Sequence, residues 1–143
     1  MTLDNLIGKL LERIEPDNAA IQRLLEASQR NIKDAEIAAL SNETRFDTGY
    51  KAIMQLANAA LQASGFRTLT SKPGHHQTLI QSLVKTVGIE TDRMIVLDAL
   101  RKQRNVTDYS GDLVEDAAVA ECLKQARHLL ETVTAWLNSK NSS

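Results

Sequence analysis

Aromatic residues and cysteine are scarce in this 143-residue chain. Phe, Trp and Tyr together make up 3% of it, so Leu, Ile, Val and Ala must supply the core. Such a core suits close-packed helices better than a β-sandwich, which usually draws on aromatic and β-branched residues. The single cysteine, Cys122, excludes an intramolecular disulfide and any multi-cysteine metal site, and it fits a reducing compartment.

Long apolar runs and an excess of one charge are also missing. No stretch approaches the roughly 18 apolar residues that a membrane span needs. The formal net charge is −1, so a nucleic-acid site would need a local cluster of Arg and Lys. The N-terminal MTLDNLIGKLLERIE interleaves charged with apolar residues, which is typical of an amphipathic helix rather than a signal peptide. These features predict a cytoplasmic protein without membrane association.

Apolar residues recur at helical spacing along most of the chain. We expect an N-terminal accessory helix within residues 1–15, ended by Pro16 and followed by Asp17 as the cap of the next helix. Five further helical stripes follow, at residues 21–39, 46–64, 79–87, 91–110 and 112–137. Gly65 stands where a C-terminal glycine is expected, and Asp112 with Glu115 is a candidate cap for the last helix. The polar tail 139–143 is expected to fray.

These stripes predict the fold class. Three long stripes with heptad-like spacing indicate helices packed along one another, and no period-two pattern indicates a strand. We therefore predict an all-α protein without a sheet: an up-and-down helical bundle with a four-helix core plus one or two additional helices. The length suits a single domain over residues 1–143. The N-terminal helix either completes this bundle or covers a partner.

The segment ALRKQRNVTDYSGD, residues 99–112, contains the most informative residue, Arg104. The apolar stripe of its helix runs through Leu97 and Leu100, and the same spacing then reaches Arg104 instead of an aliphatic side chain. A guanidinium on a core-facing stripe must be paired, or must line a cleft or an interface, because an unpaired buried charge is very costly.

Polar residues surround Arg104 in the sequence, and they allow two interpretations. Arg101 precedes it by one turn, and Asn105, Asp108 and Tyr109 follow at once. In a structural interpretation Arg104 pairs with Asp108 or with a carboxylate of a neighbouring helix and only holds the bundle together. In a functional interpretation these five residues are the ligand-binding site.

Four segments in order carry a resemblance to a known family. They are a helix containing FDTGYKAIMQLANAAL, a Gly-His turn in GHHQTLIQSL, the stretch LRKQRNVTDYSGD, and the long final helix. Together, over about residues 24–137, they resemble the HEPN superfamily (higher eukaryotes and prokaryotes nucleotide-binding), in particular its small prokaryotic members. The helical parts are generic, whereas the segment from Arg104 to Tyr109 is more specific.

The resemblance implies a four-helix up-and-down core, frequent homodimerisation and a positively lined cleft. Many members are metal-independent ribonucleases with an Arg, then four to six residues, then a His, and several are toxins beside a small nucleotidyltransferase antitoxin. The Arg of this motif falls on Arg104, and the polar residue that usually follows falls on Asn105. The His is absent, because Asp108, Tyr109 and Ser110 occupy the positions where it would stand.

The missing His has a chemical consequence. Cleavage of RNA through its 2′-OH needs a group that moves a proton near neutral pH, and an imidazole has a pKa close to that pH. A phenol with an ordinary pKa of about 10 is a poor base at pH 7, although it can donate a hydrogen bond to phosphate. Arg104 can still bind phosphate bidentately. The sequence therefore favours a binding protein over an enzyme.

Three functions are predicted. The first is a HEPN-like homodimer that binds a phosphate-bearing ligand, RNA or a nucleotide, in a toxin–antitoxin or defence-type system, with weak or absent nuclease activity. The second is a metal-independent ribonuclease that uses Arg104 with Tyr109 or with a distant His. The third is a non-catalytic interaction module, with a nucleotidyltransferase-type protein as its partner.

The remaining candidate residues favour structural roles. His75 and His76 could supply an imidazole, but their place at the start of a helix is better explained by contacts with backbone or solvent. No metal site is expected, since the sequence contains no HExxH and no CxxC motif. No cofactor is expected either, since the sequence contains no Gly-rich phosphate loop. Cys122 lies in an apolar segment and is expected to be a core residue rather than a catalytic thiol.

Overall fold

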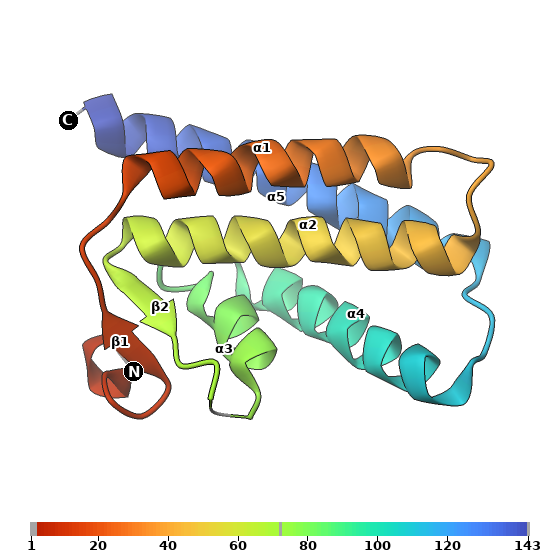
Figure 1. Cartoon of the computed structure of the whole chain (residues 1–143), viewed down its shortest axis with the longest axis horizontal. Helices are drawn as coiled ribbons and strands as arrows, with labels where there is room; N and C mark the ends of the chain where they lie inside the picture. Colours follow the sequence, from red (N-terminus) through yellow and green to blue (C-terminus); the bar gives the residue numbers. More distant parts are fainter. Residues whose placement is uncertain (1–2, 72, 143) are drawn as a thin grey trace.

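The structure, a computed structural model, describes residues 3–71 and 73–142, which form a mostly helical protein with five packed α-helices (Figure 1). In chain order the elements are the 3-10 turn η1 (Leu3–Leu6), strand β1 (Leu11–Arg13), α1 (Asn18–Ala35), α2 (Asn42–Ala63), strand β2 (Phe66–Thr68), α3 (His75–Ser82), α4 (Thr91–Ser110) and α5 (Asp116–Ser142). Five of the six predicted helices are therefore present. No helix within the described ranges is long and apolar enough to cross a membrane.

The core lies along α2, which packs against α1 on one side and against α5 on the other. Phe46, Ile53 and Ala57 of α2 are almost completely buried, as the helical stripe predicts. The same helix buries several alanines completely, and these small side chains let the neighbouring helices approach closely. The three helices with the longest predicted stripes are thus the ones that lie alongside one another.

Cys122 of α5 is a core residue, as expected. Its side chain is fully buried, its Sγ lies 3.6 Å from the carbonyl oxygen of Phe46, and burial raises its pKa to about 12. The thiol therefore stays protonated at neutral pH and is a poor nucleophile. It faces Gly49 of α2, where an added Cβ would come within 3.0 Å of the sulfur. Gly49 is therefore the residue that allows α5 to lie this close to α2.

The predicted N-terminal helix is wrong, and so is the expected absence of a sheet. Residues 3–6 form one 3-10 turn, and Leu11–Arg13 pairs antiparallel with Phe66–Thr68. Gly8 lies at φ +82, a left-handed conformation that interrupts a right-handed helix. The leucines of this segment still face the protein: Leu11 is fully buried, although in a strand. Met1 and Thr2 lie outside the described residues.

Four helix ends also differ from the predictions, the first being that of α3, which ends at Ser82 rather than near residue 87. α1 ends at Ala35 rather than near residue 39, and Arg45 donates a hydrogen bond to the Ala35 carbonyl oxygen at 2.8 Å. α5 begins at Asp116 rather than near Asp112, because Asn42 of α2 binds the chain just before that helix. The tail over residues 139–142 continues α5 instead of fraying, and Ser143 lies outside the described residues. The C-terminal glycine is confirmed: α2 ends at Ala63, and Gly65 lies at φ +92.

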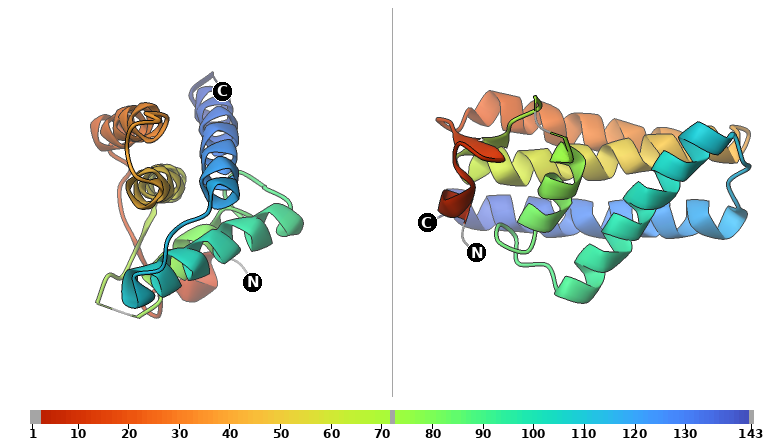
Figure 2. Two further views of the ribbon diagram at one scale, coloured as in Figure 1. Left: turned by 90° about the vertical axis from the view of Figure 1, so that its right-hand side faces the viewer. Right: turned by 90° about the horizontal axis from the view of Figure 1, so that it is seen from below.

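α4 is packed differently from the other long helices. It crosses the bundle obliquely (Figures 1 and 2). Leu97 and Leu100 are its buried residues, and both lie before its last three turns. Residues 101–110 of α4 therefore include no buried side chain, and most of them are polar.

Candidate functional site

Arg104 lies one turn after Leu100, the last buried residue of α4. It follows Leu97 and Leu100 on the same helix face, as its spacing predicts, but its side chain is 33% exposed rather than buried. No residue of α4 is buried from this turn onward, and the Arg104 side chain lies against Asp47 and Tyr50 of α2 instead of entering the core. The structure thus explains how a guanidinium occupies a stripe of aliphatic residues.

Two carboxylates and one aromatic ring surround the guanidinium. Its Nε lies 3.3 Å from Oδ2 of Asp108 and 3.9 Å from Oδ1 of Asp47, and its Cζ lies 5.3 Å from the centre of the Tyr50 ring. Within the described part of the chain Arg104 forms these ion pairs but donates no hydrogen bond. The predicted structural pairing with Asp108 is therefore present, and it leaves much of the hydrogen-bonding capacity of the guanidinium unused.

Arg104 also lines an open hollow of about 410 Å³ between α2, α3 and α4. The α2 side chains that line it recur at helical spacing, so they share one face of that helix: Asp47, Tyr50, Lys51, Met54, Gln55 and Asn58. α3 contributes His76 and α4 contributes Arg104. Two cations, one carboxylate, two carboxamides, a phenol and an imidazole therefore meet in one place.

His76, for which the sequence favoured a structural role at the start of a helix, also lines the hollow. Its Nδ1 lies 3.1 Å from the Tyr50 hydroxyl, and its ring meets that of His75 edge-on, with centroids 4.7 Å apart. Burial lowers the pKa of His76, and the positive charges of Arg104 and Arg101 lower it further, so the imidazole is neutral at pH 7. No spacing rule connects His76 to Arg104, since the two belong to different helices 28 positions apart.

Tyr50 holds this imidazole in place. Its ring centre lies 5.3 Å from the Arg104 guanidinium carbon and 5.9 Å from the centre of the His76 ring, and the residue is almost completely buried. Burial raises the pKa of Tyr50 to about 12, so its phenol keeps the proton at neutral pH. A protonated phenol can donate to Nδ1, and in that arrangement Nε2 of His76 carries the imidazole proton.

The other predicted site residues do not converge on this hollow. Arg101 pairs with Asp98 at 2.7 Å, an interaction that lowers the pKa of Asp98, and it contributes only its charge to the surroundings of Tyr50 and His76. Asn105 is exposed. Tyr109 is 94% exposed and does not line the hollow. Of the five predicted residues, only Arg104 and Asp108 are therefore brought together.

Asp47 gives the hollow a further titratable group. Burial raises its pKa above the usual value for Asp, the nearby charge of Asp108 raises it further, and Arg104 opposes both effects. This acid was not identified in the sequence, where it is one charge among many on a helix. No group of three or more His, Cys, Asp or Glu residues that could hold a metal ion occurs in residues 3–71 and 73–142.

Comparison with protein-family models finds none that matches the chain, and comparison with curated proteins finds no match either.

Proposed function

We propose that the chain is a HEPN-like protein that binds a phosphate-bearing ligand, RNA or a nucleotide, in the hollow around Arg104. The observation that carries this proposal is the state of Arg104: in residues 3–71 and 73–142 its charged partners are two loosely paired carboxylates, its side chain is one-third exposed, and it lines a hollow rather than the core. A guanidinium of this kind can take a phosphate bidentately. The four-helix up-and-down core of that superfamily is part of the same proposal.

Other side chains of the hollow suit the same ligand. Lys51 adds a second positive charge, and Gln55 and Asn58 add hydrogen-bond donors from the next turns of α2. Neutral His76 adds a donor from α3 when Nε2 carries its proton. The carboxylates of Asp47 and Asp108 oppose an anion, so their negative charges lower the affinity of the hollow for phosphate.

A titration with short single-stranded RNA and with nucleotides tests this proposal. We expect Arg104→Ala to weaken binding at least about tenfold, which corresponds to about 1.4 kcal/mol. Arg30→Ala, which removes an exposed arginine of α1 away from the hollow, is the matched control and should leave the affinity unchanged. If Arg104→Ala and the original protein bind with equal affinity, the ligand does not bind in the hollow around Arg104.

A metal-independent ribonuclease is the second candidate, and the position of His76 favours it. An imidazole beside an arginine supplies the proton-transfer group that the motif around Arg104 lacks. It acts as a base through Nε2 when Nδ1 carries the proton and donates it to the Tyr50 oxygen. Tyr109 takes no part in this arrangement, because it lies outside the hollow.

Incubation with RNA in the presence of a chelator separates the two candidates. The ribonuclease yields products with 2′,3′-cyclic phosphate ends, and both His76→Ala and Arg104→Ala abolish them, whereas Tyr109→Phe does not. A protein that binds RNA but leaves it intact at high concentration is the binding protein of the first proposal. Cleavage that persists in His76→Ala contradicts the assignment of this imidazole.

A homodimer, and a nucleotidyltransferase-type partner in a toxin–antitoxin or defence-type system, belong to the same proposal. The feature that supports an interaction surface is the end of α4 and the loop after it, where Val106, Tyr109 and Leu113 are 61%, 94% and 86% exposed. Three large apolar side chains within eight positions are typical of a surface that a protein partner covers.

A further inference from the structure

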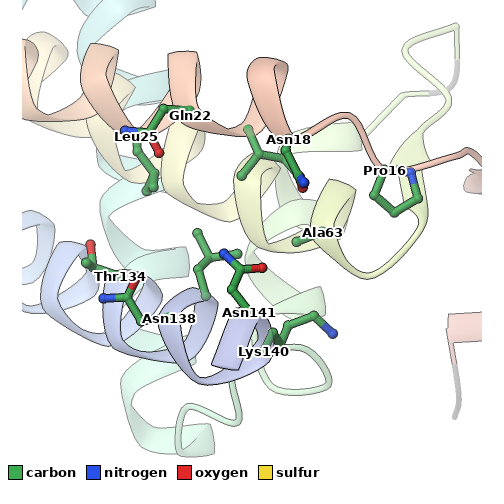
Figure 3. A pocket seen from close by; sticks show the side chains of 11 residues that line it. Pro16, Asn18, Gln22, Leu25, Ala63, Thr134, Asn138, Lys140 and Asn141 are labelled. Atoms are coloured by element: carbon green, nitrogen blue, oxygen red, sulfur yellow. The ribbon is translucent and has the colours of Figure 1, made fainter. Parts of the chain in front are cut away.

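A second hollow lies between the start of α1 and the end of α5, and it shares no residue with the hollow around Arg104 (Figure 3). Its volume is about 210 Å³. Ile21 and Leu25 of α1 and Leu137 of α5 form its floor, and each of them is at most 9% exposed. A flat, apolar molecular face can therefore pack against the bottom of this hollow.

Carboxamide side chains form the rim. Asn18 and Gln22 come from α1, and Asn138 and Asn141 come from α5 on the other side of the hollow, with the hydroxyl of Thr134 beside them (Figure 3). Each carboxamide carries both a donor and an acceptor, so the rim can pair with a ligand edge that alternates the two. Neither Asp nor Glu is among the residues that line the hollow.

The charges around this hollow favour an uncharged ligand. The first backbone amides of α1, at Ala19 and Ala20, already donate to the Asp17 carboxylate, which also repels anions. The one charged residue of the lining is Lys140, whose Nζ lies 4.9 Å from the centre of the Trp136 ring and extends away from the carboxamides in Figure 3. The hydrogen-bonding rim is therefore electrically neutral.

We propose that this hollow is a binding site for a nucleobase, with adenine as its ligand. A nucleobase is flat, its faces suit the aliphatic floor, and its edge alternates donors and acceptors. The carboxamide of Asn or Gln pairs bidentately with N6 and N7 of adenine, and rim residues of both types are present. A volume of about 210 Å³ is below the roughly 300–1,000 Å³ of sites for drug-sized ligands, which suits one small heterocycle.

An NMR titration of the ¹⁵N-labelled full chain with adenine tests the site. Adenine should shift the side-chain NH₂ signals of the rim carboxamides and bind with a Kd below about 1 mM. Gln22→Leu and Asn141→Leu should each raise the Kd about fivefold or more, as expected for one lost hydrogen bond. Benzimidazole, which keeps the flat shape but lacks the exocyclic amine, should bind more weakly than adenine.

Gln29→Leu is the matched control, because it makes the same change two turns later on α1, outside the hollow. Its Kd should equal that of the original protein, and circular dichroism shows whether each variant keeps its helices. If Gln22→Leu does not fold, Asn18→Leu replaces it. The proposal is overturned if the rim signals do not move at about 10 mM adenine, if the rim variants bind as well as the control, or if benzimidazole binds equally tightly.

Discussion

At the scale of single residues, Arg104 is shared between its own helix and the hollow. Asp108 lies one turn further along α4 and comes within 3.3 Å of the guanidinium, and both side chains are partly exposed. Ion pairs that water can reach contribute little to stability, so exchanging Asp108 for a ligand oxygen costs little. The same carboxylate competes with any anion that approaches Arg104.

Replacing Asp108 by Asn should therefore tighten the binding of a phosphate-bearing ligand. The variant removes one negative charge beside the guanidinium and keeps the size of the side chain, and we expect an affinity about three- to tenfold higher. Isothermal titration calorimetry with the nucleotide or RNA that binds the original protein measures this change. Unchanged or weaker binding would show that the ligand does not contact Arg104.

His76 predicts a pH dependence of stability. Burial lowers its folded-state pKa below the ordinary 6.5, with smaller effects from His75, Arg104 and Arg101. The unfolded chain therefore binds more protons below pH 6.5 than the folded protein does. The resulting stability is fully present above that pH and is lost as the pH falls toward the folded-state pKa.

The variant His76→Gln removes this effect. Between about pH 7 and pH 5, the free energy of unfolding should fall more steeply for the original protein than for the variant. Urea unfolding at a series of pH values measures both slopes. Parallel slopes would mean that the imidazole titrates in the folded protein as it does in the unfolded chain.

At the scale of the elements, the approach of α5 to α2 depends on one small residue. Gly49 lies inside α2, where alanine is favoured by roughly 1 kcal/mol over glycine, and it is the neighbour of the Cys122 sulfur. An added Cβ lies 3.0 Å from Sγ of Cys122, so that side chain must move by a few tenths of an ångström, whereas its 3.5 Å distance to Cδ2 of Leu123 is an ordinary contact. Helix propensity and packing therefore oppose each other at this position.

A double-mutant cycle separates the two effects. Gly49→Ala should be more favourable by about 1 kcal/mol or more in the background Cys122→Ala than in the original protein, because the shorter side chain removes the close contact. Thermal or urea unfolding of the four proteins measures the coupling. Additive effects would show that the two helices do not meet at these residues.

At the scale of the whole molecule, the C-terminal half of α4 and the loop after it lie at the surface. This half of α4 lines the hollow through Arg104, and Val106, Tyr109 and Leu113 of the same region are exposed. The proposed homodimer would cover these apolar side chains and would also place a second chain close to Arg104. The same feature of the fold thus supports both the ligand site and the interaction surface.

A charge placed on this surface should disrupt the proposed dimer. We expect the double variant Tyr109→Asp and Leu113→Asp to halve the mass measured by light scattering. The variant loses apolar contact area, and its two new negative charges lie close to the same charges of the second copy. Ile37→Asp, on the exposed turn after α1, is the control and should keep the original mass. If light scattering shows that the original protein is a monomer at every concentration, the homodimer is no longer part of the proposal.

Much of the helical fold was predictable from the sequence, whereas its N-terminal part was not. The stripes of α1, α2 and α5 are long, so one or two atypical residues do not obscure them. The segment before Pro16 is also apolar at helical spacing, but its geometry depends on Gly8 and on pairing with residues 66–68, which lie more than 50 positions away. Local pattern carries no information about such a partner.

The sequence by itself determined the helical elements, the core of aliphatic side chains and the unusual position of Arg104, because these follow from spacing within a few turns of one helix. Only the tertiary structure decided what surrounds that arginine. It directs His76 of α3 and Tyr50 of α2 to the same hollow and leaves Tyr109 in solvent. The physical reason is that a side chain's partners depend on how helices cross, and the oblique path of α4 results from packing between segments far apart in the chain.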